Sequence, residues 1–168
     1  MRSSRKPNRQ SARAAHKALA VCVTTALAMF AQPGIAATCT LNVPALNFGV
    51  YDTVGDLAMT TTITVSCSGV GNGLPFDLSV SQDSGSYAPR KMQRSGGGPI
   101  LDYYLYTDAS RAITWGDGKT GGTGVIHGTV VKGASSANAT VYGLVRGGQS
   151  VSPGSYASTA PATVTVSY

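Results

Sequence analysis

Strict alternation of apolar and polar residues recurs along this 168-residue chain and constrains its fold more than any other feature. In residues 62–67 the apolar positions are Ile63, Val65 and Cys67, and residues 76–81 and 163–168 alternate in the same way. Because successive side chains of a strand point to opposite faces, each run predicts a strand with one buried and one solvated face. Strands of this kind are typical of an antiparallel β-sandwich.

Two runs in the middle of the chain, residues 101–106 and 140–145, are apolar on both faces. They are either central strands of a sheet or strands whose outer face contacts a partner. No helical period longer than two turns follows residue 37, and residues that favour turns separate the alternating runs. The pattern therefore predicts one all-β domain.

The first 37 residues have the order of a secretory signal peptide. Six of the thirteen Lys and Arg residues lie in the first seventeen positions, an apolar stretch over residues 18–31 follows, and small residues end at Ala37. We predict cleavage after Ala37 or Ala36, an exported product, and a domain over residues 38–168. Beyond the leader seven basic residues balance seven Asp residues, which argues against nucleic-acid binding. No later run reaches the roughly 20 apolar residues that span a membrane.

Removal of the leader leaves two cysteines, Cys39 and Cys67. An even number of cysteines in an exported chain predicts one disulfide between them. A metal site is the alternative, but it needs more ligands than two distant cysteines and one histidine supply. The loop-entropy model gives a disulfide over such a loop roughly 3–4 kcal/mol of stabilisation. We expect no metal and no cofactor.

The sequence lacks the signatures of common enzymes. Gly118-Lys119-Thr120 has Ile113 where a phosphate-binding loop has its first glycine. His127 is the only histidine beyond the leader, and no G-x-S-x-G nucleophile elbow occurs. Most of the Asp residues lie in turns, where the carboxylate accepts hydrogen bonds from its own backbone. We therefore predict a protein that is not an enzyme.

Four aromatic residues are close together in the sequence, namely Tyr103, Tyr104, Tyr106 and Trp115. Aromatic rings stack on sugars, so outward-facing members of this set would form a ligand platform. Aromatic side chains of strands more often pack in a core or in cross-strand pairs. The sequence leaves both interpretations open.

Several short stretches together resemble the spore coat protein U domain family. Their order and spacing over nearly the whole mature chain are specific: Cys39, then residues 46–52, 64–67, 104–108, Arg111, and residues 115–118, 141–143, 153–156 and 164–168. The domain is similar to the subunits of archaic chaperone–usher pili of Gram-negative bacteria.

This resemblance implies an immunoglobulin-like sandwich that lacks its last strand. A periplasmic chaperone would lend a strand during folding, and another pilus subunit would replace it at an outer-membrane usher, by β-strand addition. Val164, Val166 and Tyr168 would line the acceptor groove. The implied protein is a structural pilus subunit that is exported to the periplasm and then to the cell surface, where it serves attachment and biofilm formation.

The start of the predicted mature chain departs from the fibre-forming pattern. A donor segment precedes the first cysteine in such subunits, whereas cleavage after Ala37 leaves only Thr38 before Cys39. The sequence therefore predicts a subunit that accepts a strand without donating one, at a fibre tip or terminus. The alternatives are a tip adhesin and a self-complete coat or sugar-binding module.

Overall fold

The computed structural model describes residues 36–168 except Ser84 and Ser95, so the predicted leader lies outside the described residues apart from its last two. The described part of the chain forms ten strands. In chain order these are β1 (Thr38–Asn42), β2 (Val50–Tyr51), β3 (Leu57–Ser68), β4 (Leu74–Val80), β5 (Arg90–Arg94), β6 (Ile100–Tyr106), β7 (Ile126–Val130), β8 (Ser136–Val145), β9 (Gly154–Ser158) and β10 (Val164–Ser167). None of the residues described belongs to a helix that could cross a lipid bilayer.

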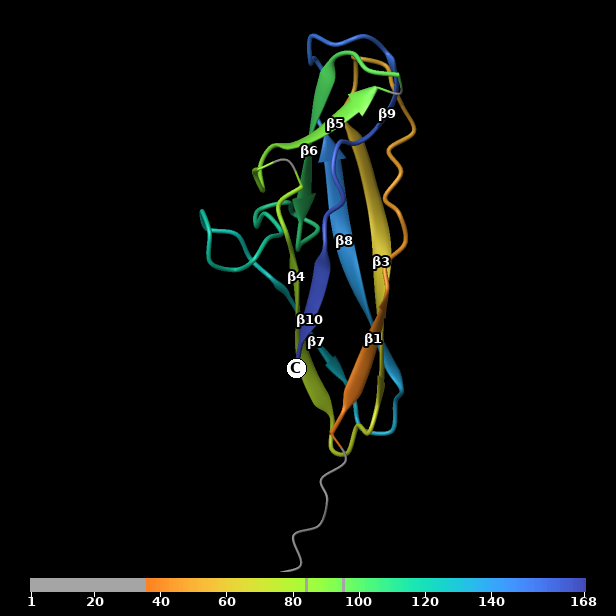
Figure 1. The fold of residues 1–168 in the computed structure, drawn as a ribbon, viewed down its shortest axis with the longest axis vertical. Coiled ribbons are helices and arrows are strands. Elements are labelled where there is room, and N and C mark those ends of the chain that lie inside the picture. Colours follow the sequence, from red (N-terminus) through yellow and green to blue (C-terminus); the bar gives the residue numbers. More distant parts are fainter. Residues whose placement is uncertain (1–35, 84, 95) are drawn as a thin grey trace, which may run out of the picture. The chain divides into compact units, whose positions relative to one another are not determined.

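The strands form two sheets. Seven of them make one sheet in the order β1-β3-β8-β6-β5-β9-β2, and three make the other in the order β10-β4-β7. Every pairing between these strands is antiparallel. Figure 1 shows the long strands β3 and β8 side by side, with β4 and β10 running along them. One buried cluster contains side chains from both sheets, which confirms the predicted all-β antiparallel sandwich.

The alternating runs bury the predicted faces. Ile63 and Val65 of β3 and Leu78 of β4 have no solvent exposure, whereas the intervening residues of β3 are partly or fully exposed. Cys67 is also buried, as its position in the alternation requires. These side chains form the core because each strand offers one apolar face and the two sheets cover each other.

The two runs that are apolar on both faces are central strands. β8 pairs with β3 on one side and with β6 on the other, and β6 pairs in turn with β5. Both runs are therefore internal strands of the larger sheet, and Leu144 and Tyr106 are only 6% and 7% exposed. This position agrees with the first of the two interpretations, that of central strands.

Trp115 links the two sheets. Its backbone N–H donates to the carbonyl of Leu105 in β6 at 2.8 Å, and its indole N–H donates to the carbonyl of Leu78 in β4 at 2.9 Å.

A close contact lies between β7 and β4, where a Cβ atom on Gly128 would stand 2.3 Å from the Phe76 ring. Only glycine leaves room for this ring.

Candidate functional site

Strand β10 has one free edge. The N–H of Ser81 donates to the carbonyl of Thr163 at 2.9 Å, so these two residues form a hydrogen-bonded pair just before β10. Bonding alternates along an antiparallel ladder, so Thr165 and Ser167 also direct their backbone groups to β4. The backbone groups of Val164 and Val166 consequently point to the other edge, which no described strand covers.

Strand β1 also has a free edge, at the end of the larger sheet. The N–H of Cys67 donates to the carbonyl of Ser135 at 2.8 Å, on the side of β3 away from β1. Cys39 lies opposite Cys67, and Leu41 lies two residues further on. By the same alternation, the backbone groups of Cys39 and Leu41 point away from β3 to an edge that no described strand pairs.

A cavity of about 580 Å³ lies beside β10 and the segment that follows β1, and we call it the groove. Val164 and Ala162 line one side of it, and residues 43–48, which follow β1, line another. Core side chains such as Ile63, Val80 and Val141 line it as well. None of the described residues that line it is charged, so this part of the groove suits apolar and neutral side chains.

Residues 43–48 form a wall of the groove that sequence reasoning did not predict. Phe48 packs edge-on against Tyr103, with ring centroids 5.9 Å apart. Both Leu46 and Phe48 lie over Gly143 of β8, where a Cβ atom would stand 2.4 Å from the leucine and 2.8 Å from the phenylalanine. The sequence signal for this wall was the two-residue spacing of Leu46 and Phe48, which is the spacing of a strand. The segment follows Pro44 and does not form a strand.

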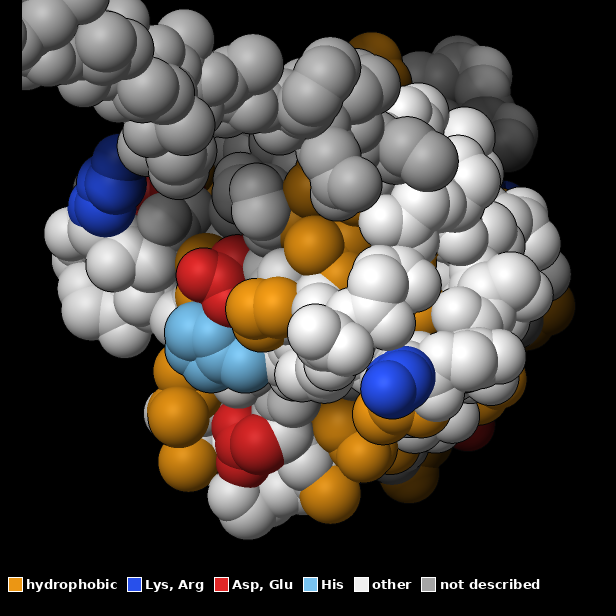
Figure 2. All heavy atoms as spheres, turned by 90° about the horizontal axis from the view of Figure 1, so that it is seen from below, with side chains coloured by type: hydrophobic (Ala, Val, Ile, Leu, Met, Phe, Trp, Pro, Cys, Tyr) orange, Lys and Arg blue, Asp and Glu red, His pale blue; other side chains and the backbone are white. Residues whose placement is uncertain are grey.

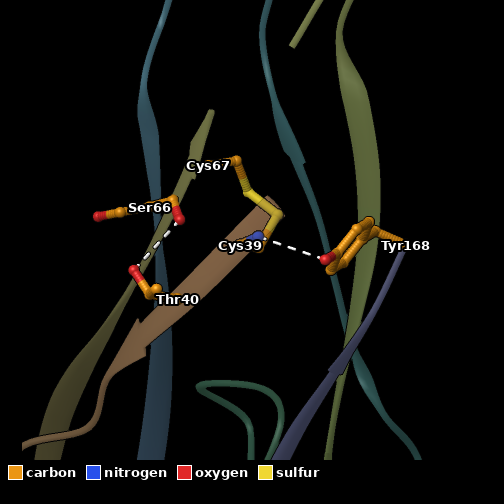
Figure 3. Close-up of a disulfide and its surroundings, with 5 residues drawn as sticks. All are labelled: Cys39, Thr40, Ser66, Cys67 and Tyr168. Atoms are coloured by element: carbon orange, nitrogen blue, oxygen red, sulfur yellow. Dashed lines mark hydrogen bonds between the residues drawn. A yellow bond between two sulfur atoms is a disulfide. The ribbon is translucent and has the colours of Figure 1, made fainter. Parts of the chain in front are cut away.

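The predicted disulfide is present, and it joins β1 to β3. Cys39 and Cys67 are direct neighbours across the two strands, with Cα atoms 4.1 Å apart. Figure 3 shows that the N–H of Cys39 also donates to the hydroxyl of Tyr168, at 3.3 Å. The free edge of β1 is thus in contact with the end of β10.

The three residues predicted to line an acceptor groove take different positions. Val164 lines the groove, and Val166 is partly buried and packs against the core. Tyr168 is 55% exposed and lies beyond the groove, at its contact with Cys39. Alternation put Tyr168 on the same face as Val164 and Val166 but could not show that β10 ends before it.

Three of the four aromatic residues considered as ligand-facing are buried instead. Tyr103, Tyr106 and Trp115 are 7%, 7% and 3% exposed, so they do not form an outward-facing platform. Tyr104 is partly exposed; it stacks on Tyr106 with ring centroids 6.3 Å apart, and Arg146 lies 5.7 Å from its ring centre. The physical reason is tertiary packing: Phe48 packs on Tyr103, and the indole of Trp115 lies between the sheets, bonded to Leu78.

A buried polar cluster lies beside the groove, and the sequence gave no sign of it. The Arg90 guanidinium is inaccessible to solvent; it donates to the carbonyl of Ser81 at 3.1 Å and lies 3.5 Å from the Asp83 carboxylate. The Tyr103 hydroxyl donates to the same carboxylate. Burial, and then the hydrogen bond and charge of Asp83, raise the pKa of Tyr103 to about 12.

Catalytic or metal-binding groups do not gather in the described residues. His127 contacts Asp77 at 2.6 Å across β7 and β4, but both side chains are mostly exposed. No group of three or more His, Cys, Asp or Glu side chains within residues 36–168, Ser84 and Ser95 aside, could hold a metal ion. Figure 2 shows few charged side chains among apolar and neutral ones on the face seen from below.

The fold and the groove define a class of protein, an antiparallel sandwich with free strand edges at β1 and β10 and a groove beside β10. Residues 25–165 match the model of the Spore Coat Protein U domain, and the chain belongs to this family. It is 33% identical over 131 residues to Protein U of Myxococcus xanthus, a match that covers 71% of this chain and 70% of that protein.

One solved structure shows the same fold. It is the crystal structure of the CsuC–CsuE chaperone–tip adhesion subunit pre-assembly complex from archaic chaperone–usher Csu pili of Acinetobacter baumannii, with a TM-score of 0.52 and 18% identity. That match covers 79% of this chain, which spans only 40% of the matched chain. The E. coli Hda pilus minor tip subunit HdaB has a TM-score of 0.34 and 21% identity, over 78% of this chain and 79% of that one.

Proposed function

We propose that this protein is a non-catalytic structural subunit of a bacterial surface pilus built by the chaperone–usher route, and that it accepts a β-strand from a partner. The groove beside β10, together with the free edges of β10 and β1, carries the proposal. Its lining is uncharged, and each of the two strands offers an edge that no described strand pairs.

An added strand would satisfy both edges together. On one side it would meet the backbone groups of Val164 and Val166, and on the other those of Cys39 and Leu41. Alternate side chains of that strand would point into the groove, because the period of a strand is two residues. A free edge beside an apolar groove promotes aggregation, which is why such a subunit needs a chaperone before assembly.

The comparisons support this proposal through the family and the fold. The CsuC–CsuE structure contains a chaperone with a pilus subunit, and this chain shares its fold. The partners we propose are therefore a periplasmic chaperone, an outer-membrane usher and other pilus subunits. The predicted leader over residues 1–37 would direct export to the periplasm. Assembly into the pilus would then bring the subunit to the cell surface, where it would serve attachment and biofilm formation.

The test is expression of the full chain in a bacterial periplasm, with and without a co-expressed pilus chaperone of the CsuC type. We expect a soluble one-to-one complex with the chaperone and poor recovery without it. Val164→Asp places a charge in the uncharged groove and should abolish the complex. Thr165→Asp is the matched control, because Thr165 is the exposed neighbour on the same strand.

Amide hydrogen exchange, read by NMR, tests the geometry directly. In the isolated chain the amides of Val164 and Val166 should exchange fast while that of Thr165 is protected by β4. A bound strand should protect all three. A stable monomer, recovered without a chaperone and already protected at Val164 and Val166, would show that the sandwich is self-complete and would contradict the proposal.

A further inference from the structure

A second cavity, of about 200 Å³, lies between two loops, and we call it the loop cleft. One wall comes from the chain after β4, and the other from the chain between β6 and β7. The residues of the first wall are Gln82, Gly85, Ser86, Tyr87 and Ala88, and those of the second are Thr114, Thr120, Gly121 and Thr123. None of these residues lines the groove, so the loop cleft is a separate feature.

The second wall is held in shape by the carboxylate of Asp117. It accepts the backbone N–H groups of Thr120 at 2.8 Å and Lys119 at 2.9 Å, and the hydroxyl of Thr123 at 3.0 Å. The bonds from the backbone of Thr120 and Lys119 hold the pKa of Asp117 well below its usual range. A fixed negative charge therefore stands beside the loop cleft at neutral pH.

The ring of Tyr87 is also held in place. The guanidinium of Arg90 lies over it, 5.6 Å from the ring centre, and Arg90 is itself fixed by Ser81 and Asp83. Burial, and next the charge of Asp117, raise the pKa of the Tyr87 hydroxyl. This tyrosine thus connects both walls of the loop cleft. A ring fixed in advance loses little entropy when a ligand stacks on it.

The chemistry of the lining points to a carbohydrate. It offers one amide, several hydroxyl groups and one aromatic ring, and it contains no Lys, Arg, Asp or Glu. Hydroxyls and amides both donate and accept hydrogen bonds, as sugar hydroxyls require, and an aromatic face suits the C–H side of a sugar ring. A volume equal to roughly six or seven water molecules accommodates one sugar ring.

We propose that the loop cleft binds one pyranose ring of a neutral carbohydrate. The Tyr87 ring stacks on the sugar, Gln82 and the hydroxyls of Ser86 and Thr114 bind its hydroxyl groups, and the ionised Asp117 disfavours acidic sugars. This goes beyond the strand-accepting role and does not depend on it. It also places sugar binding on residues other than the aromatic set considered from the sequence.

The experiment is saturation-transfer NMR on the full chain with the methyl glycosides of glucose, galactose, mannose and N-acetylglucosamine, and with methyl glucuronide as the acidic counterpart. We expect at least one neutral glycoside to bind with a dissociation constant on the order of 1–10 mM, and the glucuronide to bind at least about tenfold more weakly.

Two variants assign the site. Gln82→Ala changes an exposed side chain and should weaken binding about fivefold, the usual effect of one lost hydrogen bond. Tyr87→Ala should abolish binding, and circular dichroism checks its fold. Tyr104→Ala is the matched control, since Tyr104 lines neither cavity, and it should bind like the wild type.

Binding of none of the neutral glycosides would overturn the proposal. Binding that survives both Gln82→Ala and Tyr87→Ala, or that is lost in Tyr104→Ala, would place the sugar elsewhere and overturn it as well. These results leave the strand-accepting role untouched, because the chaperone complex and the exchange of Val164 and Val166 report on that role separately.

Discussion

Loss of the Cys39–Cys67 disulfide should lower the free energy of unfolding by about 3–4 kcal/mol. The bond joins residues with a sequence separation of 28. In the loop-entropy model, closing a loop of this length removes about 12 cal/mol/K from the unfolded chain, which is about 3.6 kcal/mol at 25 °C. Domains of this kind are stable by about 5–15 kcal/mol in total, so the loss is large.

The structure adds a local effect to this general one. Strand β1 pairs only with β3, and its other edge meets no described strand. Without the disulfide, the ladder to β3 and the contact from Cys39 to Tyr168 remain to hold β1 in place. We therefore expect the amides of β1 to exchange faster than those of β8, which lies in the middle of its sheet.

The assay is guanidinium unfolding of the full chain and of the Cys39→Ser, Cys67→Ser double variant. Both proteins are measured either with the chaperone bound or without it. The double variant is preferable to Cys39→Ser alone because it leaves no free thiol in the buried position of Cys67. The expected result is a lower midpoint. A change of less than about 1 kcal/mol, with unaltered exchange in β1, would refute the reasoning.

Three further predictions concern the core. The unfolded chain loses the Tyr103 proton near pH 10, whereas the folded chain keeps it to about pH 12. The free energy of unfolding should therefore fall by about 2–3 kcal/mol over this interval. Alkaline unfolding should show a smaller fall in the Tyr103→Phe variant. Arg90→Met leaves the buried Asp83 carboxylate without its cation, so urea unfolding should show a loss of about 3–5 kcal/mol in the free energy of unfolding. Lys91→Met is the control, because it breaks a partly exposed pair and should cost at most about 1 kcal/mol. Equal losses in the two variants would contradict this prediction. Gly128→Ala forces its new methyl group into the Phe76 ring and should cost about 1–3 kcal/mol; an unchanged melting temperature would show that the ring moves freely.

The sequence by itself determined the buried faces of the alternating strands and the disulfide. These are local or countable properties: the two-residue period assigns Ile63, Val65 and Cys67 to one face wherever the strand lies, and an exported chain with two cysteines has one pair to form. The apolar character of residues 101–106 and 140–145 on both faces left two interpretations open, and the sheet order places both runs in internal strands.

Sequence reasoning left open whether the four aromatic residues face a ligand, because the answer depends on neighbours far along the chain. Tyr103 is covered by Phe48, and the indole of Trp115 bonds to Leu78, 37 residues earlier. The ion pair of Arg90 and Asp83 was equally invisible, since neither position carries a pattern that distinguishes a buried charge from an exposed one.

Only the tertiary structure decided where the molecule is open. β10 pairs with β4 on one edge and β1 pairs with β3 on one edge, and no described strand pairs their other edges. Which edges stay free depends on the order of all the strands, which brings together residues as distant in sequence as Cys39 and Tyr168. The alternation of apolar and polar residues determines which face of each strand is buried. Only the assembled sheets determine which backbone N–H and C=O groups stay unpaired and can bind a partner strand.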